Sequence, residues 1–378
     1  MKILFLHSSS DLYGASKILL AVTELCKEQE HEVTVVLTEA GILSERLLEI
    51  GVEVIFIDLA ILRRKYFSIS GIINRSTTIY KAYFALLKLC SERQFQLIYS
   101  NTTAVIVGHF VSIKMKTKHI WHIHEIIEKP TLLFRFLSFL LNHPNNRIIT
   151  VSKSVQQHWS KYVAQNKMEV LYNGVEYWKF NDQSSNFREV LHIPSDAIVI
   201  GMVGRVHFWK GQDYFLRIAS ELHKEFLNLF FVCVGDPFSG YEYLYKNLED
   251  IIVSEGLQES VRLVPFQSNI SKVYNTFNLL VLPSQLPDPA PLVVSEAMAS
   301  GIPVIATNQG GTVEIIENGI SGILIPLNDV KEAANKISSL ITDDTARKKM
   351  GAAAKERVEK HFSRKIFNQK IIEFIEER

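Results

Sequence analysis

The stretch "NLLVLPSQLPDPAPLVVSEAMASGIPVIAT" (residues 278–307) decides the fold class. Two apolar runs, "LLVL" and "IPVIAT", flank a proline-rich loop and the helix-like segment "LVVSEAMAS". Apolar runs separated by helix-length segments are typical of parallel sheets that are covered on both faces. The four prolines of the loop fix φ and remove backbone donors, so the loop is expected to be stiff. The stretch therefore predicts an α/β unit in which a rigid loop joins a strand end to a helix.

The same alternation of strand and helix patterns runs through the whole chain. The predicted strands are residues 2–7, 32–37, 52–57, 96–100, 119–123, 147–151 and 168–172, followed by 197–204, 229–235, 261–266, 278–284, 302–307 and 322–326. This pattern predicts an α/β fold with two doubly wound, Rossmann-like domains that face each other across a cleft. We place the domains at residues 1–178 and 179–360, joined by the aperiodic segment "NGVEYWKFNDQSSNF". Residues 361–378 are expected to form a helix that packs back on the N-terminal domain.

Composition excludes several classes of protein. The chain has 378 residues, of which 47% are hydrophobic and 21% charged, as in globular proteins with sizeable cores. The apolar start of the chain is too short for a signal-peptide core, and no apolar run is long enough for a membrane span. The three cysteines, Cys26, Cys90 and Cys233, are far apart, which favours reduced thiols over a disulfide framework. A cytoplasmic protein is expected.

The charge is unevenly distributed along the chain. Lys and Arg outnumber Asp and Glu in residues 1–178, and the reverse holds in residues 179–378. The basic half contains "ILRRKYF" (61–67), "SIKMKTKH" (112–119) and a Phe- and Leu-rich segment at 129–147. Cationic residues beside apolar clusters can attach a protein to an anionic membrane. This pattern predicts peripheral contact with the inner face of a membrane, whereas a nucleic-acid partner is not expected at this net charge.

The Phe- and Leu-rich segment allows an alternative interpretation. Leu132, Phe136, Phe139 and Leu140 could instead form the core-facing side of an ordinary helix.

Two loops of the N-terminal half stand at predicted strand ends, where parallel sheets bind ligands. Gly14 follows the first strand and precedes a helix whose free N–H groups can bind an anion, although a plain tight turn is the alternative. His124 follows the strand at 119–123 and is a candidate contact for a substrate hydroxyl. A metal site from His119, His122, His124 and Glu125 is disfavoured, because strand alternation sends neighbouring side chains to opposite faces. The GxGxxG spacing of a dinucleotide-binding fold is missing from the Gly14 loop, which counts against a dehydrogenase.

Arg205 and Lys210, in "GMVGRVHFWKGQDYFL" (201–216), are the strongest candidates in the C-terminal half. They follow a strand that ends in glycine and precede an amphipathic helix. A planar guanidinium and a point-charge ammonium together suit a diphosphate, although a solvated basic loop is the alternative.

The order GR-x4-KG, then the proline-rich loop, then "SEAMASGIPVIATNQGGTVEIIENGISGILI" (295–325) resembles the donor-binding half of retaining glycosyltransferases of family 4, which have the GT-B fold. The resemblance covers about residues 200–326. Over the N-terminal half it is weaker and rests on the Gly14 loop, His124, "VSKSVQ" and "NGVE". The two acids of the family signature, separated by seven residues, read here as Asp288 and Glu296.

The resemblance implies a role for each acid. Glu296 is expected to accept hydrogen bonds from the ribose of a nucleotide, and Asp288 to contact hydroxyls of the donor sugar. Family members often have Phe-Gly after the first acid, where this sequence has Ala290-Pro291. Proline cannot donate, so Leu292 and Val293 are expected to supply the amides at the helix start. The residues Pro265 and Phe266 are expected to lie against the nucleotide base.

The implied reaction is the transfer of a sugar from a nucleotide-diphosphate sugar to a hydroxyl of a glycan or lipid-linked acceptor, with retention at the anomeric carbon, in cell-surface polysaccharide synthesis. A UDP-sugar is the expected donor and a GDP-sugar the alternative. No cofactor and no metal are expected, since the sequence contains no Asp-x-Asp pair. A nucleotide-sugar epimerase and a non-catalytic sugar-nucleotide-binding protein remain alternatives.

Overall fold

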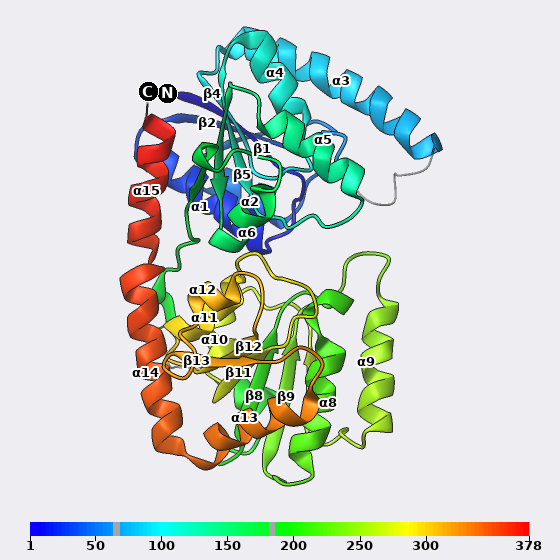
Figure 1. The fold of residues 1–378 in the computed structure, drawn as a ribbon, viewed down its shortest axis with the longest axis vertical. Coiled ribbons are helices and arrows are strands. Elements are labelled where there is room, and N and C mark those ends of the chain that lie inside the picture. The colour runs from blue at the N-terminus through cyan, green and yellow to red at the C-terminus, as the bar shows by residue number, and fades with distance from the viewer. Residues whose placement is uncertain (63–68, 181–185, 378) are drawn as a thin grey trace. The chain divides into compact units, whose positions relative to one another are not determined.

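The computed structural model describes residues 1–62, 69–180 and 186–377, and it divides into two units (Figure 1). Unit 1 comprises Met1–Asn173 and Phe367–Arg378, and unit 2 comprises Gly174–Ile366. The chain therefore passes from unit 1 to unit 2 after Asn173, five residues before the predicted boundary, and returns before Phe367. Most of the basic segment at 61–67 lies outside the described residues.

Unit 1 contains a seven-stranded parallel sheet in the order β3-β2-β1-β4-β5-β6-β7. Its strands are β1 (Lys2–Leu6), β2 (Glu32–Leu37), β3 (Glu53–Phe56), β4 (Leu97–Ser100), β5 (Lys118–Ile123), β6 (Asn146–Thr150) and β7 (Met168–Val170). The register places Leu6 of β1 beside Val36 of β2 on one side and Ser100 of β4 on the other. The strand order reverses between β1 and β4, and this reversal marks where doubly wound sheets bind ligands.

The helices of unit 1 are α1 (Gly14–Glu28), α2 (Ile42–Glu49), α3 (Ile69–Arg93), α4 (Val107–Met115), α5 (Thr131–Leu141) and α6 (Lys153–Trp159). Helix α1 packs beside α2, and α3 packs beside α4. Buried apolar residues of β1, β4, α3 and α4, such as Leu6, Ile98, Leu86 and Val111, form one core cluster. Because both faces of the sheet are covered, its strands read as continuous apolar runs in the sequence.

Helix α5 has one buried and one exposed apolar face. Phe134 and Leu140 are buried, but the side chains of Leu132, Phe136 and Phe139 are 80%, 43% and 76% exposed. The interpretation of the four-residue set as a core face is therefore wrong for the three exposed residues and correct for Leu140.

The C-terminal helix α15 (Arg364–Glu376) belongs to unit 1 from Phe367 onward. The Arg147 guanidinium lies 3.9 Å from the centre of the Phe374 ring and donates a 2.7 Å hydrogen bond to the Phe374 carbonyl. The Glu376 carboxylate approaches His31 Nε2 at 3.2 Å. The last turns of the chain are thus anchored to β6 and to the loop before β2.

Unit 2 contains a six-stranded parallel sheet in the order β10-β9-β8-β11-β12-β13. Its strands are β8 (Ile198–Val203), β9 (Leu229–Val234), β10 (Val261–Val264), β11 (Leu279–Leu282), β12 (Val304–Thr307) and β13 (Gly322–Ile325). The order reverses between β8 and β11, which pair through Ile200 and Leu279. All thirteen predicted strands are present, and the predicted fold class of two doubly wound α/β domains is confirmed.

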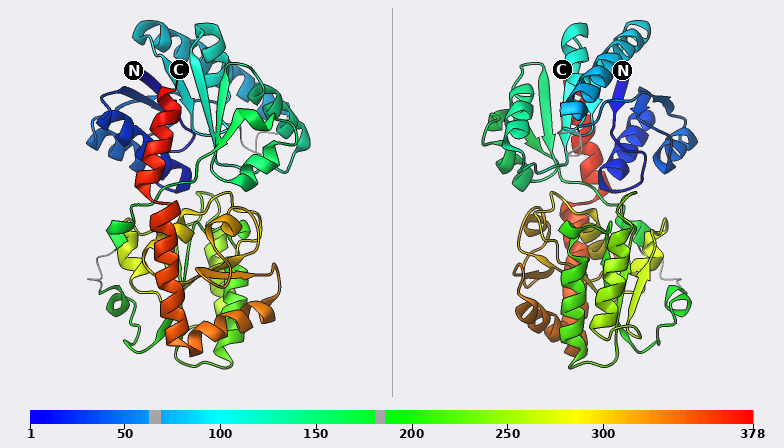
Figure 2. Two further views of the ribbon diagram at one scale, coloured as in Figure 1. Left: turned by 60° about the vertical axis from the view of Figure 1, so that its left-hand side comes forward. Right: turned by 90° about the vertical axis from the view of Figure 1, so that its right-hand side faces the viewer.

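The helices of unit 2 are α7 (Phe187–Val190), α8 (Gln212–His223), α9 (Tyr243–Ser254), α10 (Ile270–Tyr274), α11 (Leu292–Ala299), α12 (Thr312–Ile315), α13 (Val330–Thr342) and α14 (Asp344–His361), with short 3-10 turns at Tyr177–Phe180 and Phe208–Lys210. Helix α8 packs against α9 and α13, and α11 packs against α14. The right-hand view of Figure 2 looks onto α8 and α9. Asp329 and Asp343 cap α13 and α14 by accepting backbone hydrogen bonds of 2.9 and 2.8 Å.

Within the described residues, no helix combines the length and the apolar character that a membrane span requires.

Candidate active site

The candidate residues of unit 2 meet where its strand order reverses. Arg205 and Lys210 follow β8, and Asp288 follows β11, so the loops after two neighbouring strands bring Lys210 into contact with Asp288. Doubly wound sheets bind ligands at this position, because the helices that start there lie on opposite faces and leave a crevice.

Backbone hydrogen bonds fix the proline-rich loop to its neighbours. The Gln285 N–H donates to the Trp209 carbonyl at 2.6 Å, and the Gly311 N–H donates to the Asp288 carbonyl at 2.7 Å. Gly310 has φ of +61°, and a Cβ there would lie 2.4 Å from the Asp288 carbonyl oxygen. The "GG" at 310–311 is therefore required by the close approach of the loop that carries Asp288.

Lys210 and Asp288 form an ion pair, in which Lys210 Nζ contacts Asp288 Oδ2. The side chains are only 20% and 13% exposed. Gly211 follows with φ of +79°, and a Cβ there would lie 2.1 Å from the Pro283 carbonyl oxygen, so only glycine lets the two loops approach this closely. A cation expected to bind a diphosphate and an acid expected to bind a sugar thus form an ion pair with each other.

Helix α11 begins beside this pair. Pro291 is the N-cap residue with ψ of 107°, and Leu292 is the first helical residue. Val294 N donates to the Pro291 carbonyl at 3.1 Å, whereas the N–H groups of Leu292 and Val293 lie in the first turn, where a helix offers donors to an anion. Ala290, like Leu292 and Val293, is partly exposed.

Glu296 lies one turn further along α11 and is only 7% exposed. The Tyr274 hydroxyl of α10 donates a 2.9 Å hydrogen bond to Glu296 Oε2. Burial raises the pKa of Tyr274 well above its usual value, and the Glu296 carboxylate raises it further, so the phenol stays protonated. One carboxylate oxygen of Glu296 is therefore held in place by a permanent donor.

Arg205 stacks on an aromatic ring. Its guanidinium carbon lies 3.8 Å from the centre of the Phe238 ring, within cation–π range. Gln212 Nε2 donates to the Arg205 carbonyl at 3.0 Å, which ties the loop to the start of α8. The Phe238 ring thus supports the Arg205 guanidinium, and the start of α8 holds the Arg205 backbone.

Pro265 and Phe266 follow β10 and so lie, like the other candidates, at the carboxyl ends of the strands. The Phe266 N–H donates a 3.1 Å hydrogen bond to Asp236 Oδ2, so Asp236 orients this turn. Pro265 is exposed and Phe266 partly exposed, which leaves both accessible to a ligand.

In unit 1, His124 belongs to a hydrogen-bonded group at the ends of β1, β4 and β5. His124 Nε2 lies 3.2 Å from Asn101 Oδ1, and Asn101 Nδ2 lies 3.3 Å from His7 Nδ1. Asn101 Nδ2 also donates to the Ala15 carbonyl at 2.9 Å, which connects the group to the start of α1. His7 and Asn101 flank the point at which this sheet reverses its strand order, and His124 lies partly exposed at the end of the next strand.

Hydrogen bonds from the loop after β4 hold the Glu125 carboxylate in place. Its carboxylate accepts hydrogen bonds from the Thr102 hydroxyl, from the N–H and hydroxyl of Thr103 at 3.4 and 3.3 Å, and from the His124 N–H at 3.2 Å. Burial raises the pKa of the Glu125 carboxyl, and these donors offset part of that rise. Glu125 therefore fixes the backbone that carries His124.

Gly14 is the first residue of α1 and is exposed. A Cβ built on it would have no protein atom within 4 Å, and its φ is not in the left-handed region. The fold itself therefore does not require glycine at this position.

The histidines near His124 have separate partners. His119 bonds to Ser100 and Asn146, and His122 bonds to the Tyr99 hydroxyl at 2.7 Å. In the part of the chain that the structure describes, no three His, Cys, Asp or Glu side chains are grouped as a metal site would need.

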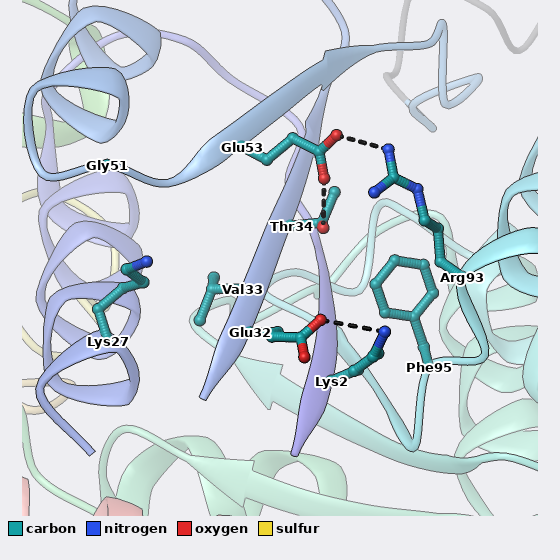
Figure 3. Close-up of a pocket in the computed structure, with 9 residues that line it drawn as sticks. All are labelled: Lys2, Lys27, Glu32, Val33, Thr34, Gly51, Glu53, Arg93 and Phe95. Carbon is teal, nitrogen blue, oxygen red and sulfur yellow. Dashed lines mark hydrogen bonds and ion pairs between the residues drawn. The ribbon is translucent and has the colours of Figure 1, made fainter. Parts of the chain in front are cut away.

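A pocket of about 230 Å³ lies around the amino ends of β1, β2 and β3 in unit 1 (Figure 3). Four of its charged groups form two ion pairs: Lys2 Nζ lies 3.1 Å from Glu32, and Arg93 donates to Glu53 at 2.9 Å. Thr34 also donates to Glu53 at 3.0 Å. These contacts lie at the amino ends of the strands, whereas the candidate site residues lie at the carboxyl ends.

Three residues of this arrangement were missed by sequence reasoning. Asn101 directly follows a predicted strand, and Asp236 comes two residues after β9, so a search for polar residues at strand ends could have found both. Tyr274 lies inside a short helix and carries no such signal.

Comparison with known proteins assigns both halves of the chain. The model of the family described as "Glycosyltransferase Family 4" matches residues 13–177, and that described as "Glycosyl transferases group 1" matches residues 183–357. An uncharacterized glycosyltransferase of Methanocaldococcus jannaschii is 27% identical over 60% of this chain and 59% of its own length. The UDP-Gal:alpha-D-GlcNAc-diphosphoundecaprenol alpha-1,3-galactosyltransferase of Escherichia coli is 24% identical over 88% of this chain and 86% of its own. The chain spans about three fifths of the length of the first of these two relatives.

Solved structures share the fold. Anabaena HepE, crystallised with UDP and glucose, superposes with a TM-score of 0.87 at 24% identity and covers 100% of both chains. Sucrose-phosphate synthase from Thermosynechococcus elongatus superposes with a TM-score of 0.81 at 17% identity, over 99% of this chain and 98% of its own. The two doubly wound units have the GT-B architecture of these structures. The chain belongs to family 4 of the glycosyltransferases, and the resemblance seen in the sequence is confirmed.

Proposed function

We propose that this protein transfers a sugar from a nucleotide-diphosphate sugar to a hydroxyl group of a glycan or lipid-linked acceptor, with retention at the anomeric carbon. The observation that carries the proposal is the meeting of Lys210, Asp288 and the start of α11 at the strand reversal of unit 2. These groups form a compact site with a cation, an acid and helix N–H donors, which is the set that a sugar joined to a diphosphate requires.

The departing diphosphate gains negative charge as the sugar leaves. Arg205 and Lys210 stabilise that charge, and the N–H groups of Leu292 and Val293 add the positive end of α11. Within unit 1, the start of α1 at Gly14 is a further helix N-terminus with room for a ligand, since a Cβ built on Gly14 would have no protein atom within 4 Å. These donors replace a metal ion, and the reaction is proposed to need none.

Glu296 binds the ribose hydroxyls of the nucleotide. The Tyr274 hydroxyl donates to one of its carboxylate oxygens and so orients the carboxylate for the ribose. Pro265 and Phe266 lie against the base. Asp288 exchanges Lys210 for sugar hydroxyls when the donor binds, and His124 contacts a hydroxyl of the donor or the acceptor.

The reaction proceeds on one face of the sugar. A double displacement needs a carboxylate placed as a nucleophile, and Asp288 is instead paired with a lysine. We therefore favour a mechanism in which the leaving phosphate accepts the proton of the attacking hydroxyl on the same face.

Similar proteins support the choice of substrates. HepE was crystallised with UDP and UDP-glucose, and the Escherichia coli relative is named for a UDP-galactose donor and an acceptor linked to diphosphoundecaprenol. A relative from Staphylococcus aureus is named as a capsular polysaccharide biosynthesis glycosyltransferase. A UDP-sugar donor, a GDP-sugar alternative and a role in cell-surface polysaccharide synthesis follow as proposals for this chain.

A thermal-shift panel tests the donor. UDP, GDP, ADP and their hexose derivatives are compared at equal concentration, because a ligand that binds only the folded chain raises its melting temperature. We expect the largest shift from UDP and UDP-hexoses, and a smaller one in the Glu296→Gln variant. Equal shifts from all three bases, or none, would contradict a UDP-sugar donor. Sugar interconversion without an acceptor would instead indicate an epimerase.

Contact with an anionic membrane is proposed through the exposed face of α5. Leu132, Phe136 and Phe139 are exposed there, and Arg135 lies among them. The basic residues Arg63, Arg64 and Lys65, expected to assist, lie outside the described residues.

Flotation with phosphatidylglycerol vesicles tests this contact. We expect salt-sensitive binding that is lost in a Leu132→Ser, Phe139→Ser double variant and is weak on phosphatidylcholine. A wild-type protein that stays unbound at low salt would refute the proposed contact.

A further inference from the structure

The side-chain amide of Asn101 has only one orientation that satisfies its neighbours. Asn101 is fully buried, and its Nδ2 lies 2.9 Å from the Ala15 carbonyl oxygen. A carbonyl can only accept, so the atom facing it must be the amide nitrogen. The opposite orientation would place two oxygen lone pairs against each other. The backbone of α1 thus decides which way Asn101 points.

This orientation fixes the protons on both histidines beside it. Asn101 Nδ2 donates its second hydrogen to His7 Nδ1, so the proton of neutral His7 sits on Nε2 and is donated to the Ser16 hydroxyl at 3.0 Å. The Ser16 hydroxyl in turn donates to Asp11 at 3.3 Å. Asn101 Oδ1 can only accept, so the nitrogen that faces it at 3.2 Å, His124 Nε2, must carry a proton.

The other ring nitrogen of His124 is left as an acceptor. No hydrogen bond to His124 Nδ1 is present among the described residues, and the side chain is partly exposed at the strand end. A nitrogen with a lone pair binds an O–H group and repels a phosphate oxygen. We propose that Asn101 is a positioning residue that holds His124 with its proton on Nε2, so that Nδ1 accepts a hydrogen bond from a sugar hydroxyl. The inference rests on the proposed contact between His124 and substrate.

The surroundings keep His124 neutral. The titratable groups that face this part of unit 1 are His7, Asp11, Tyr99, His122 and Glu125. Burial lowers the pKa of His124 well below its ordinary value, and His122 and His7 lower it further. Burial also lowers the pKa of His7 to about 4 and of His122 to about 3, so both rings are neutral near pH 7. The acceptor on His124 is therefore available throughout the neutral range.

The first test reads the tautomer directly and needs no substrate. The full chain is labelled with ¹⁵N-histidine, and long-range ¹H–¹⁵N correlation spectra distinguish protonated from unprotonated ring nitrogens. His124→Gln assigns the signals of His124. We expect a protonated Nε2 and an unprotonated Nδ1 from pH 6 to 8. A proton on Nδ1, alone or together with Nε2, would overturn the inference whatever the enzyme's donor proves to be.

The second test is the variant Asn101→Asp. The carboxylate that replaces the amide still accepts from Nε2, but it loses the donor to the Ala15 carbonyl, so the variant is first checked for folding. Its negative charge stabilises the doubly protonated ring and raises the pKa of His124. Protonation removes the acceptor at Nδ1. With release of UDP from UDP-glucose as the assay, the wild type should show a flat profile from pH 6 to 8. The variant should lose activity toward low pH, by about tenfold per pH unit below the raised pKa of His124.

Asn146→Asp is the matched control. Like Asn101, Asn146 is a buried asparagine of unit 1 that contacts two histidines and a backbone carbonyl. Its Oδ1 lies 2.8 Å from His119 and 3.2 Å from His109, and its Nδ2 donates to the Leu140 carbonyl at 2.7 Å. It begins β6, at the amino ends of the strands, whereas His124 lies at their carboxyl ends. Its variant should lose stability but keep the wild-type pH profile. If Asn101→Asp also keeps the wild-type profile, Asn101 does not act through His124. If no protein turns over UDP-glucose, the proposed donor fails while the spectra still decide the tautomer.

Discussion

The Lys210–Asp288 ion pair makes a prediction about product binding. Asp288→Asn preserves the shape of the side chain but removes its charge. The Asp288 carboxylate is paired with Lys210, and a diphosphate that binds Lys210 must approach that carboxylate. We therefore expect the variant to bind UDP more tightly than the wild type, while transfer from the UDP-sugar becomes slower because the contact with the sugar is weakened.

The magnitude follows from the geometry. Two oxygens that both contact Lys210 Nζ lie about 5 Å apart. Like charges at about 5 Å repel by roughly 0.8 kcal/mol at the dielectric constant of water and by about 3 kcal/mol at an effective value of about 20. The two side chains are 20% and 13% exposed, so solvent screens part of this repulsion. A gain of about 1 kcal/mol, or roughly fivefold in Kd, is expected.

Isothermal titration of UDP at low and at physiological salt measures the effect. The matched control is Glu221→Gln, which breaks the 2.6 Å pair between Lys224 and Glu221 at the end of α8 and should leave UDP affinity unchanged. The gain for Asp288→Asn should shrink as salt is added. An unchanged or weaker affinity for UDP in a well-folded Asp288→Asn protein would refute the reasoning, because the carboxylate would then not compete with the diphosphate.

Three further predictions concern the same site. Tyr274→Phe removes a buried hydrogen bond to the Glu296 carboxylate. Urea titration should therefore give a free energy of unfolding that is lower by about 1.5–3 kcal/mol, and UDP should bind more weakly. Unchanged stability would mean that the bond is not formed. Arg205→Ala should weaken UDP binding by about 2–4 kcal/mol. Phe238→Leu keeps the charge but removes the ring on which Arg205 stacks, so it should weaken UDP binding by only about 0.5–1 kcal/mol. Equal losses of UDP affinity in titrations of the two variants would assign the effect to the ring. Transfer should survive EDTA, and loss of activity with recovery on adding Mn²⁺ would contradict metal-independent catalysis.

The fold could be predicted because parallel strands covered on both faces leave a strong local signal. Runs such as "LLVL" at 279–282 are buried throughout, so their position follows from composition alone. The residues at the strand ends followed from the same pattern and from the family motif.

The contacts among those residues could not be predicted. Lys210 and Asp288 are 78 positions apart, and their pairing depends on the course of two loops and on side-chain rotamers. The bond between Tyr274 and Glu296 likewise depends on how α10 packs beside α11, which no periodicity encodes. The tautomer of His124 depends on a carbonyl of α1, more than a hundred residues earlier in the chain.

The return of the chain to unit 1 at Phe367 determines the order in which the units can be completed on the ribosome. Unit 2 is one continuous segment, Gly174–Ile366, and can close its core while the chain is still being synthesised. Unit 1 lacks Phe367, Ile371 and Phe374, which are all buried, until the whole of unit 2 has been synthesised. The N-terminal half is therefore the last to mature. A nascent chain stalled before residue 367 should carry a folded unit 2 and a protease-sensitive unit 1.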